Sequence, residues 1–230
     1  MSSIRAVLFD LDGTLVDSAA DLAAAANRML GALGLPPCSV DDVKTYVGKG
    51  IPRLVHRALV GRLDGDADPA LHARALVLFE AAYAEESGRH SAVFAGVVDG
   101  LKKLRAAGLR LACVTNKAER FTLDLLEATG LAGYFDVVVS GDSTPRKKPD
   151  PMPFLHACER LGVAPAEACV IGDSANDVAA ARAAGIRVLC VPYGYNEGEP
   201  VAALGEPIVD TVAHAAAMLL ETTGAPAPAR

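Results

Sequence analysis

The sequence predicts an α/β protein: a Rossmann-like parallel sheet with helices on both faces, into which an all-helical cap domain is inserted. Several short runs are continuously apolar, which is typical of parallel strands buried on both faces. Helical patterns separate most of these runs, and strand–helix–strand connections imply right-handed crossovers. After the first apolar run, a long segment carries helix signals and no convincing strand. One α/β core with a helical insertion accounts for all three observations.

The apolar runs place the strands of the core. We predict strands over residues 6–9, 110–115, 137–140, 168–172 and 187–191, and a weaker one over 207–209. The helices between them are recognised by their apolar spacing and by the glycine that follows each one, the usual C-terminal signal. We predict these helices over residues 97–107, 121–129, 154–161 and 178–184.

The insertion is predicted over residues 17–88, so the core comprises 1–16 and 89–221. Ser18 to Asp21 and Ser39 to Asp42 each have the spacing of a capping box, which marks a helix start. Pro52 suits the first turn of a third helix, and a fourth follows Asp68 and Pro69. The residues 222–230, rich in alanine and proline, predict a disordered tail.

Composition limits the partners and the compartment. The 230 residues carry a net charge of −6 and no basic cluster beyond residues 146–148, so we expect neither nucleic acid nor a membrane as partner. No apolar run is long enough to span a bilayer, and the N-terminus lacks a signal core. The five cysteines form no C-x-x-C pair, which predicts buried thiols in a reducing cytoplasm.

Polar residues follow the predicted strands. Asp10 and Asp12 follow the first strand, and taken alone this pair fits a solvated turn, a nucleotide-site acid or a metal site. Thr115 and Asn116 end the second strand, and Asp173 and Asp177 follow the fourth. In an open parallel sheet, ligands bind at the carboxyl edge beside the point where strand order reverses. If the first strand is central, these groups converge there.

The chemistry of this set is mutually consistent. Clustered aspartates need a cation, and oxygen ligands suit Mg²⁺. Thr115 and Lys148, the latter from the loop after the third strand, are donors that suit phosphate oxygens. The cation and the lysine would offset the repulsion between a carboxylate nucleophile and a phosphate dianion. The set therefore predicts an Mg²⁺-dependent phosphoryl-transfer site.

The segments "DLDGTLVDS", "VTN", "KKPDP" and "GDSANDV", in this order, resemble the four motifs of the haloacid dehalogenase-like hydrolase superfamily. The resemblance implies that Asp10 is the nucleophile that forms an aspartyl-phosphate, and that Asp12 is the general acid and then the base. It implies that Asp10, the Asp12 backbone carbonyl and Asp173 hold Mg²⁺, while Asp177 orients a metal-bound water or Lys148. The phosphate would be held by Thr115, Lys148 and the nearby Asn116, as catalytic or binding groups. Lys148, the lysine directly before proline, takes the family position rather than Lys147.

Within the superfamily, Asp12 disfavours haloalkanoate dehalogenases and phosphonoacetaldehyde hydrolases, which lack this second acid. The cap segment "YVGKGIPRLV" and the later segment "VPYGYNEGE" resemble phosphoglycolate phosphatases, which commonly have asparagine where Lys49 stands. The resemblance implies 2-phosphoglycolate, a small phosphorylated metabolite, as substrate. In the cap, Gly48 and Lys49 fit a substrate-specificity loop or a plain turn, and Arg53 and Arg57, one helical turn apart, fit contacts to the substrate carboxylate or surface charges. Phosphatases for sugar phosphates, N-acetylmuramate 6-phosphate or pyrophosphate remain alternatives, as does a β-phosphoglucomutase-like mutase.

An interpretation of a different class is an aspartyl-phosphate switch domain, which holds the acyl phosphate as a signal. Such domains are about half as long and have no cap after the first strand. A base for water at Asp12 predicts turnover instead. Either a monomer or a homodimer is compatible with the sequence.

Overall fold

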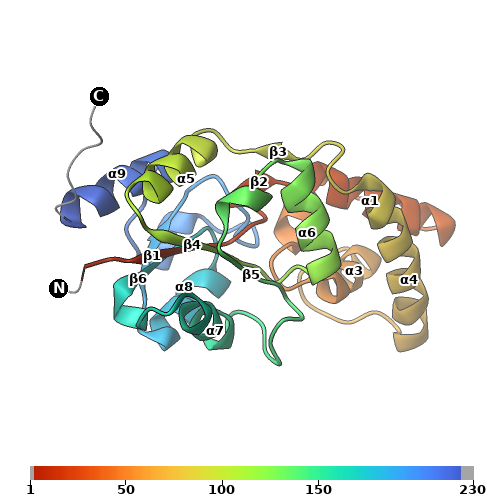
Figure 1. The fold of residues 1–230 in the computed structure, drawn as a ribbon. Helices are drawn as coiled ribbons and strands as arrows, with labels where there is room; N and C mark the ends of the chain where they lie inside the picture. Colours follow the sequence, from red (N-terminus) through yellow and green to blue (C-terminus); the bar gives the residue numbers. More distant parts are fainter. Residues whose placement is uncertain (1–2, 224–230) are drawn as a thin grey trace.

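The computed structural model describes residues 3–223 and contains a five-stranded parallel sheet with helices on both faces (Figure 1). The strand order is β5-β4-β1-β6-β7, so the N-terminal strand is central and the predicted second and fourth strands flank it. The strands are β1 (Ala6–Phe9), β4 (Arg110–Val114), β5 (Val137–Val139), β6 (Ala168–Gly172) and β7 (Arg187–Cys190). The predicted fold class is confirmed.

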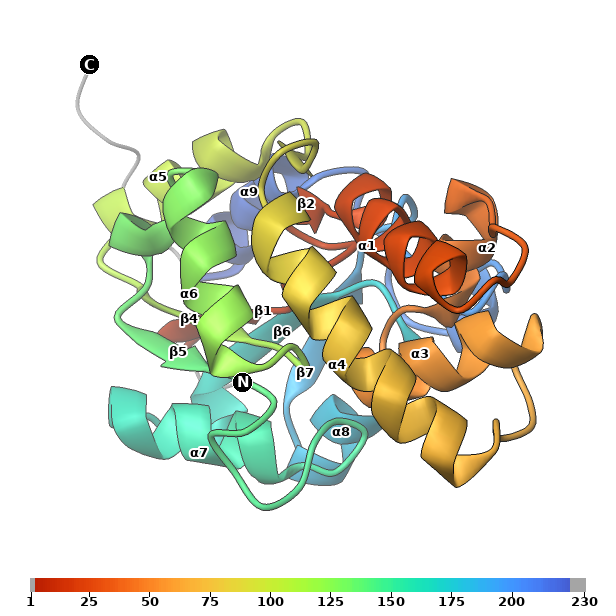
Figure 2. The ribbon, with the colours of Figure 1, turned by 90° about the vertical axis from the view of Figure 1, so that its right-hand side faces the viewer.

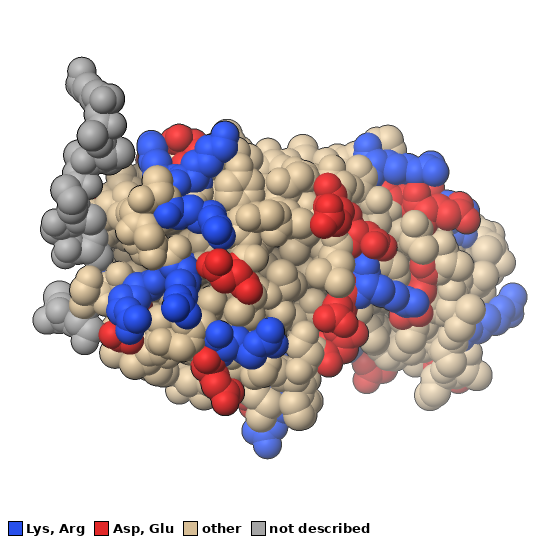
Figure 3. All heavy atoms as spheres, viewed as in Figure 1, with Lys and Arg blue, Asp and Glu red and all other residues tan. Residues whose placement is uncertain are grey.

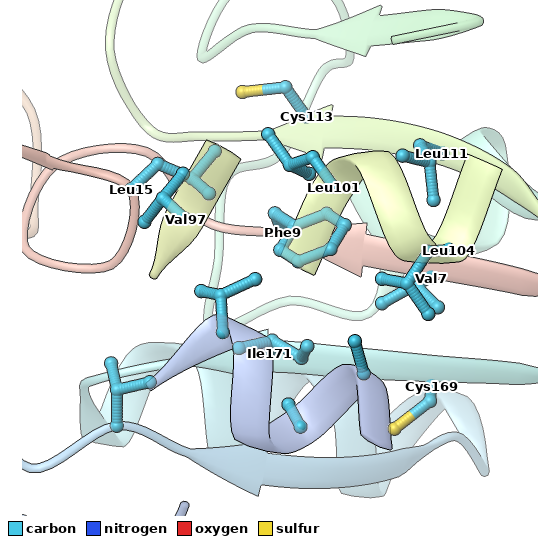
Figure 4. Packing of buried hydrophobic residues seen from close by; sticks show 14 of the residues in the cluster. Val7, Phe9, Leu15, Val97, Leu101, Leu104, Leu111, Cys113, Cys169 and Ile171 are labelled. Carbon is cyan, nitrogen blue, oxygen red and sulfur yellow. The ribbon is translucent and has the colours of Figure 1, made fainter. Parts of the chain in front are cut away.

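Two layers of helices bury the sheet. Along β1, Val7 and Phe9 join one apolar cluster and Ala6 and Leu8 join the other, because successive side chains of a strand point to opposite faces. Figure 4 shows Phe9 inside the first cluster. The helices of that face are α5 (Val97–Ala106), α6 (Glu119–Ala128) and α9 (Val212–Thr223), and those of the other are α7 (Met152–Leu161) and α8 (Ala175–Ala184). Burial on both faces explains the continuous apolar runs.

The four helices expected between the first two strands of the sheet are present and form a group of their own. They are α1 (Ala19–Ala32), α2 (Val40–Tyr46), α3 (Ile51–Val60) and α4 (Pro69–Glu86). Their apolar faces share a third cluster, to which the rest of the chain contributes Phe121 and Tyr195. Figure 2 shows these helices gathered together, with α4 toward the viewer.

A short antiparallel ribbon connects the two ends of this helical group to the sheet. Strand β2 (Val16–Asp17) pairs with β3 (Ala92–Val93). The sequence indicated no strand here, because two residues are too few to produce a recognisable alternation. The Tyr195 hydroxyl also links β2 to the start of α1, since it donates to Asp17 and accepts from the backbone N–H of Ala19 at 3.2 Å.

The two predicted capping boxes have different outcomes. The box from Ser39 to Asp42 is confirmed, with the Asp42 N–H 3.0 Å from Ser39 Oγ. The box at Ser18 is wrong, since this side chain makes no capping bond to α1. Asp21 is fully buried and accepts instead from the backbone N–H groups of Gly88, His90 and Ser91 at 2.7–3.1 Å. Tertiary partners outcompete the local ones, and they tie α1 to the end of α4.

The C-terminal region also departs from expectation. Residues 207–209 form only an isolated bridge, between Ile208 and Cys190, rather than a strand. The predicted tail 222–230 lies outside the described residues except for its first two positions, which belong to α9. Four cysteines are buried as predicted, whereas Cys38 is half-buried.

Charges of both signs are interspersed over the face drawn in Figure 3, without a region of one sign. Among residues 3–223, none of the helices has the length and apolar character needed to cross a membrane.

Candidate active site

The polar residues that follow three neighbouring strands come together at one edge of the sheet. Asp10 follows β1, Thr115 follows β4, and Asp173 follows β6. Because these strands are adjacent and parallel, their carboxyl ends lie side by side at the point where the strand order reverses. The structure therefore places these residues as the sequence led us to expect.

Lys148 connects two of the aspartates. Its buried ammonium lies 2.8 Å from Asp10 Oδ1 and 2.7 Å from Asp177 Oδ1, and it donates to the Val114 carbonyl at 2.8 Å. The neighbouring Lys147 is exposed. Burial lowers the pKa of Lys148, but the two carboxylates outweigh it and hold this pKa above its ordinary value. A fixed positive charge thus faces Asp10.

One lysine is not enough for the carboxylates present. Oxygens of Asp10, Asp173 and Asp177 lie within 4.8 Å of one another. Burial and the nearby Asp177 raise the pKa of Asp10 to about 7, although Lys148 acts in the opposite direction. Burial, with Asp10 and Asp177 close by, raises the pKa of Asp173 well above its ordinary value. These carboxylates therefore fit a cation, which would supply the missing positive charge.

Within this cluster Asp177 already has partners for both oxygens. Besides Lys148, it accepts from the backbone N–H of Ser174 at 3.2 Å and from Ser174 Oγ at 2.7 Å, as part of the capping box of α8. Asp173 accepts from Thr14 Oγ1 at 2.5 Å and from the backbone N–H of Tyr195 at 2.6 Å. Asp177 is thus a partner of Lys148, and its supporting role stays a prediction.

The Asp173 carboxylate occupies space that is available because two neighbouring residues are glycines. A Cβ on Gly13 would lie 2.5 Å from Asp173 Oδ2, and Gly13 has a φ of +91°, which favours glycine. A Cβ on Gly194 would overlap the same side chain. The glycines therefore help to define the position of this carboxylate.

Asp12 is held by a lysine that the sequence analysis did not single out. Both of its oxygens lie 3.0 Å from Lys117 Nζ, and Oδ1 also accepts from Ser18 Oγ at 2.5 Å. Burial lowers the pKa of Lys117, but Asp12 and then Tyr83 outweigh it and keep this pKa above its ordinary value. The only sequence signal that Lys117 belongs to the site is its position, directly after Asn116 at the end of a strand.

Asn116 joins three segments. Its side-chain amide donates to the carbonyls of Gly48 and Lys148, both at 2.8 Å, and its Oδ1 accepts from the Lys148 N–H at 2.9 Å. The side chain therefore links the β4 end, the lysine loop and the segment between α2 and α3. A direct contact of Asn116 with phosphate stays a prediction.

A cavity of about 40 Å³ lies between the strand ends and the helical group. A buried water needs roughly 10–15 Å³ of such space, so the cavity has room for a few waters. Its walls come from both sides: Asp10, Asp12, Thr115, Asn116, Lys117, Lys148, Ser174 and Asn176 from the core, and Leu22, Val47, Gly48, Gly50, Ile51 and Leu54 from the helices. A larger ligand would require the two sides to separate.

Of the three cap residues that we expected at the substrate, only Gly48 is among those lining the cavity. Lys49 Nζ lies 2.8 Å from Glu197. The Arg53 guanidinium lies 2.6 Å from Asp66, and it donates to the Leu63 carbonyl at 2.9 Å. In this arrangement Lys49 and Arg53 are engaged with other protein groups.

The family model that describes haloacid dehalogenase-like hydrolases matches residues 4–185. Among curated proteins, the phosphoglycolate phosphatase of Thiobacillus denitrificans is 53% identical over 94% of this chain and 96% of its own length. That of Nitrosospira multiformis is 57% identical over 86% of this chain and 87% of its own. Among solved structures, that of a predicted phosphoglycolate phosphatase from Haemophilus somnus has a TM-score of 0.87 and 33% identity, covering 95% and 99% of the two chains.

Proposed function

This chain belongs to the haloacid dehalogenase-like hydrolase family, and we propose that it hydrolyses 2-phosphoglycolate to glycolate and phosphate through a phosphorylated Asp10. The observation that carries this proposal is the position of Asp10, at the end of the central strand and 2.8 Å from the buried Lys148. The substrate is inferred from the two relatives described above, which are phosphoglycolate phosphatases with about half of their residues identical.

In the first step, an oxygen of Asp10 attacks phosphorus, and the bond from phosphorus to the glycolate oxygen breaks. Asp12 donates a proton to that oxygen, so that the product leaves as an alcohol. Lys148 and Thr115 hold the phosphate oxygens, where their donors offset the charge of the transition state. Asp12 lines the same cavity as Asp10, which supports this division of roles.

In the second step, a water attacks the phosphorus of the aspartyl-phosphate. Asp12, now a carboxylate, accepts a proton from that water, and the bond between phosphorus and Asp10 breaks. Free phosphate and the original Asp10 result. A residue that can accept the proton of the attacking water distinguishes this enzyme from a domain that stores the acyl phosphate.

We propose Mg²⁺ as the cation, held by Asp10, Asp173 and the Asp12 backbone carbonyl, with Asp177 supporting Lys148. The raised pKa values of Asp10 and Asp173 support a cation between them. When bound, Mg²⁺ supplies positive charge against the phosphate. Oxygen-only ligands and room for waters are what Mg²⁺ prefers.

We propose residues 17–88 as a cap that closes over the phosphate. The bond from Asn116 to the Gly48 carbonyl and the small cavity beneath it support a closed form of this cap. The β2–β3 ribbon is the proposed hinge, because both ends of the cap pass through it. Unpaired cysteines support the cytoplasm as its compartment.

The test is phosphate release with Mg²⁺ from 2-phosphoglycolate, β-glucose 1-phosphate, N-acetylmuramate 6-phosphate and pyrophosphate. We expect the highest kcat/KM for 2-phosphoglycolate. A higher value for another ester would reject the substrate and keep the chemistry. A stable aspartyl-phosphate with almost no phosphate release would reject the phosphatase itself.

A further inference from the structure

The two aspartates of the first motif are held by two different lysines. Lys148 contacts Asp10 and Asp177, whereas Lys117 contacts Asp12. The Lys117 ammonium lies 3.0 Å from both Asp12 oxygens, which fixes the position of the carboxylate. Ser18 Oγ donates to Asp12 Oδ1 alone, so the two contacts together limit rotation of the carboxylate.

The surroundings of Lys117 come from both sides of the cavity. The residue follows β4 in the core, and only 5% of it is exposed. Its ammonium lies 4.9 Å from the centre of the Tyr83 ring, on helix α4. Tyr83 is fully buried and packs edge-on against Phe121. The helical group thus covers the ion pair and leaves little of it exposed, which strengthens the attraction.

We propose that Lys117, together with Ser18, is a positioning residue that aims the Asp12 carboxyl group at the leaving oxygen and then at the attacking water. This inference rests on the phosphatase function proposed above. Proton transfer requires the donor and acceptor to be within hydrogen-bond reach, so a misplaced Asp12 slows both steps. Closure of the helical group completes the arrangement, because Tyr83 of α4 then lies against Lys117.

A competing role for Lys117 is contact with the substrate carboxylate, since the residue also lines the cavity. Three small phosphates separate the roles. Ethyl phosphate and acetyl phosphate have the same size and no carboxylate, but acetate leaves without a proton whereas ethoxide needs one. 2-Phosphoglycolate has both an alkoxide leaving group and a carboxylate.

The experiment measures phosphoryl transfer to Asp10 in a single turnover with Mg²⁺, by acid quench and detection of labelled phosphoryl-enzyme. For Lys117→Met we expect the ratio of the ethyl phosphate rate to the acetyl phosphate rate to fall by about 10²-fold, the scale of lost general acid catalysis. In an Asp12→Asn background, where the acid is already absent, Lys117→Met should change the ratio no further.

Arg120→Met is the matched control. Arg120 lies three residues further along and also reaches α4, at Glu80, 2.6 Å away, but it does not contact Asp12. Its removal should leave the ratio unchanged. If Lys117→Met does not fold, Lys117→Gln and Ser18→Ala provide the same measurement with smaller changes of charge and volume.

Three outcomes would overturn the assignment. If Lys117→Met slows phosphoryl transfer from ethyl phosphate and from acetyl phosphate equally, Lys117 contacts the phosphate or only supports the fold. A loss confined to 2-phosphoglycolate would make it a carboxylate contact. If the wild-type protein accepts phosphate from none of the three compounds, the proposed function fails and this inference with it.

Discussion

The carboxylate of Glu197 lies 2.6 Å from the guanidinium of Arg57, although 140 positions separate the two residues. Arg57 belongs to α3 and is almost completely buried, whereas Glu197 lies in the segment after β7. Lys49 Nζ reaches the same carboxylate at 2.8 Å. One carboxylate of the core thus meets two cations of the helical group, beside the cavity that both enclose.

Replacing Glu197 by Gln should weaken this connection. A hydrogen bond to a charged group contributes about 1.5–3 kcal/mol, and solvent screening at the one-third-exposed Glu197 reduces this contribution further. We therefore expect urea unfolding at pH 7 to show a loss of about 1 kcal/mol. Glu159→Gln, at an exposed position, is the control and should change stability by less than about 0.5 kcal/mol.

The effect of Glu197→Gln should depend on pH. Burial raises the pKa of Glu197, but Lys49 and Arg57 outweigh it and hold this pKa below its ordinary value. A depressed carboxyl pKa stabilises the folded state above the unfolded pKa, and this stability is lost as pH falls through the folded pKa. The difference between wild type and variant should therefore shrink in acid. An equal difference in unfolding free energy between wild type and variant at pH 7 and at about pH 3.5, which is below the ordinary pKa of Glu, would contradict this prediction.

Asp10→Asn should abolish turnover, because an amide cannot form the acyl phosphate. We expect a fall on the order of 10⁶-fold in kcat, as when other covalent nucleophiles are removed. Circular dichroism should show the fold unchanged, and labelled phosphate should no longer attach to the protein. Asp210→Asn, an exposed position, is the control. Substantial residual hydrolysis would exclude Asp10 as nucleophile.

Removal of the metal should abolish activity and change how the stability of the protein depends on pH. In the metal-free protein Asp10 has a pKa of about 7, raised by burial and Asp177. A raised carboxyl pKa means that the folded state binds the extra proton, so this contribution to stability is lost as pH rises through 7. With EDTA we expect Tm to fall from pH 6 to pH 8, and Mg²⁺ to restore activity and reverse much of this fall.

Mg²⁺ affinity measured by calorimetry should rise over the same pH interval, because the cation competes with the proton for Asp10. An affinity that is constant from pH 6 to pH 8, or activity in strict metal absence, would contradict the proposed site.

Gly194→Ala should displace the Asp173 carboxylate, since the new methyl group would overlap it. We expect a loss of about 1–3 kcal/mol, typical of overpacking, and a weaker Mg²⁺ affinity. Gly31→Ala, in helix α1 with nothing within 4 Å of the new methyl group, is the control and should stabilise by about 0.5–1 kcal/mol. Unchanged metal affinity in Gly194→Ala would argue against Asp173 as a ligand.

The sequence by itself determined the sheet, the helical insertion and the residues at the strand ends. These features are local: burial on both faces leaves a continuous apolar run, and glycine follows many helix ends. The sequence also predicted that the residues after β1, β4 and β6 lie close together, because parallel strands share a carboxyl edge. Only the central place of β1 had to be assumed, and the structure confirms it.

The tertiary structure alone decided which charged group meets which. Ser18 lies where a capping residue should be, yet it bonds to Asp12; Lys117 reaches the same carboxylate across 105 positions. Glu197 has no local pattern that pairs it with Arg57. Such contacts form between segments that are distant in the sequence and adjacent in the fold. A pattern of neighbouring residues therefore does not predict them.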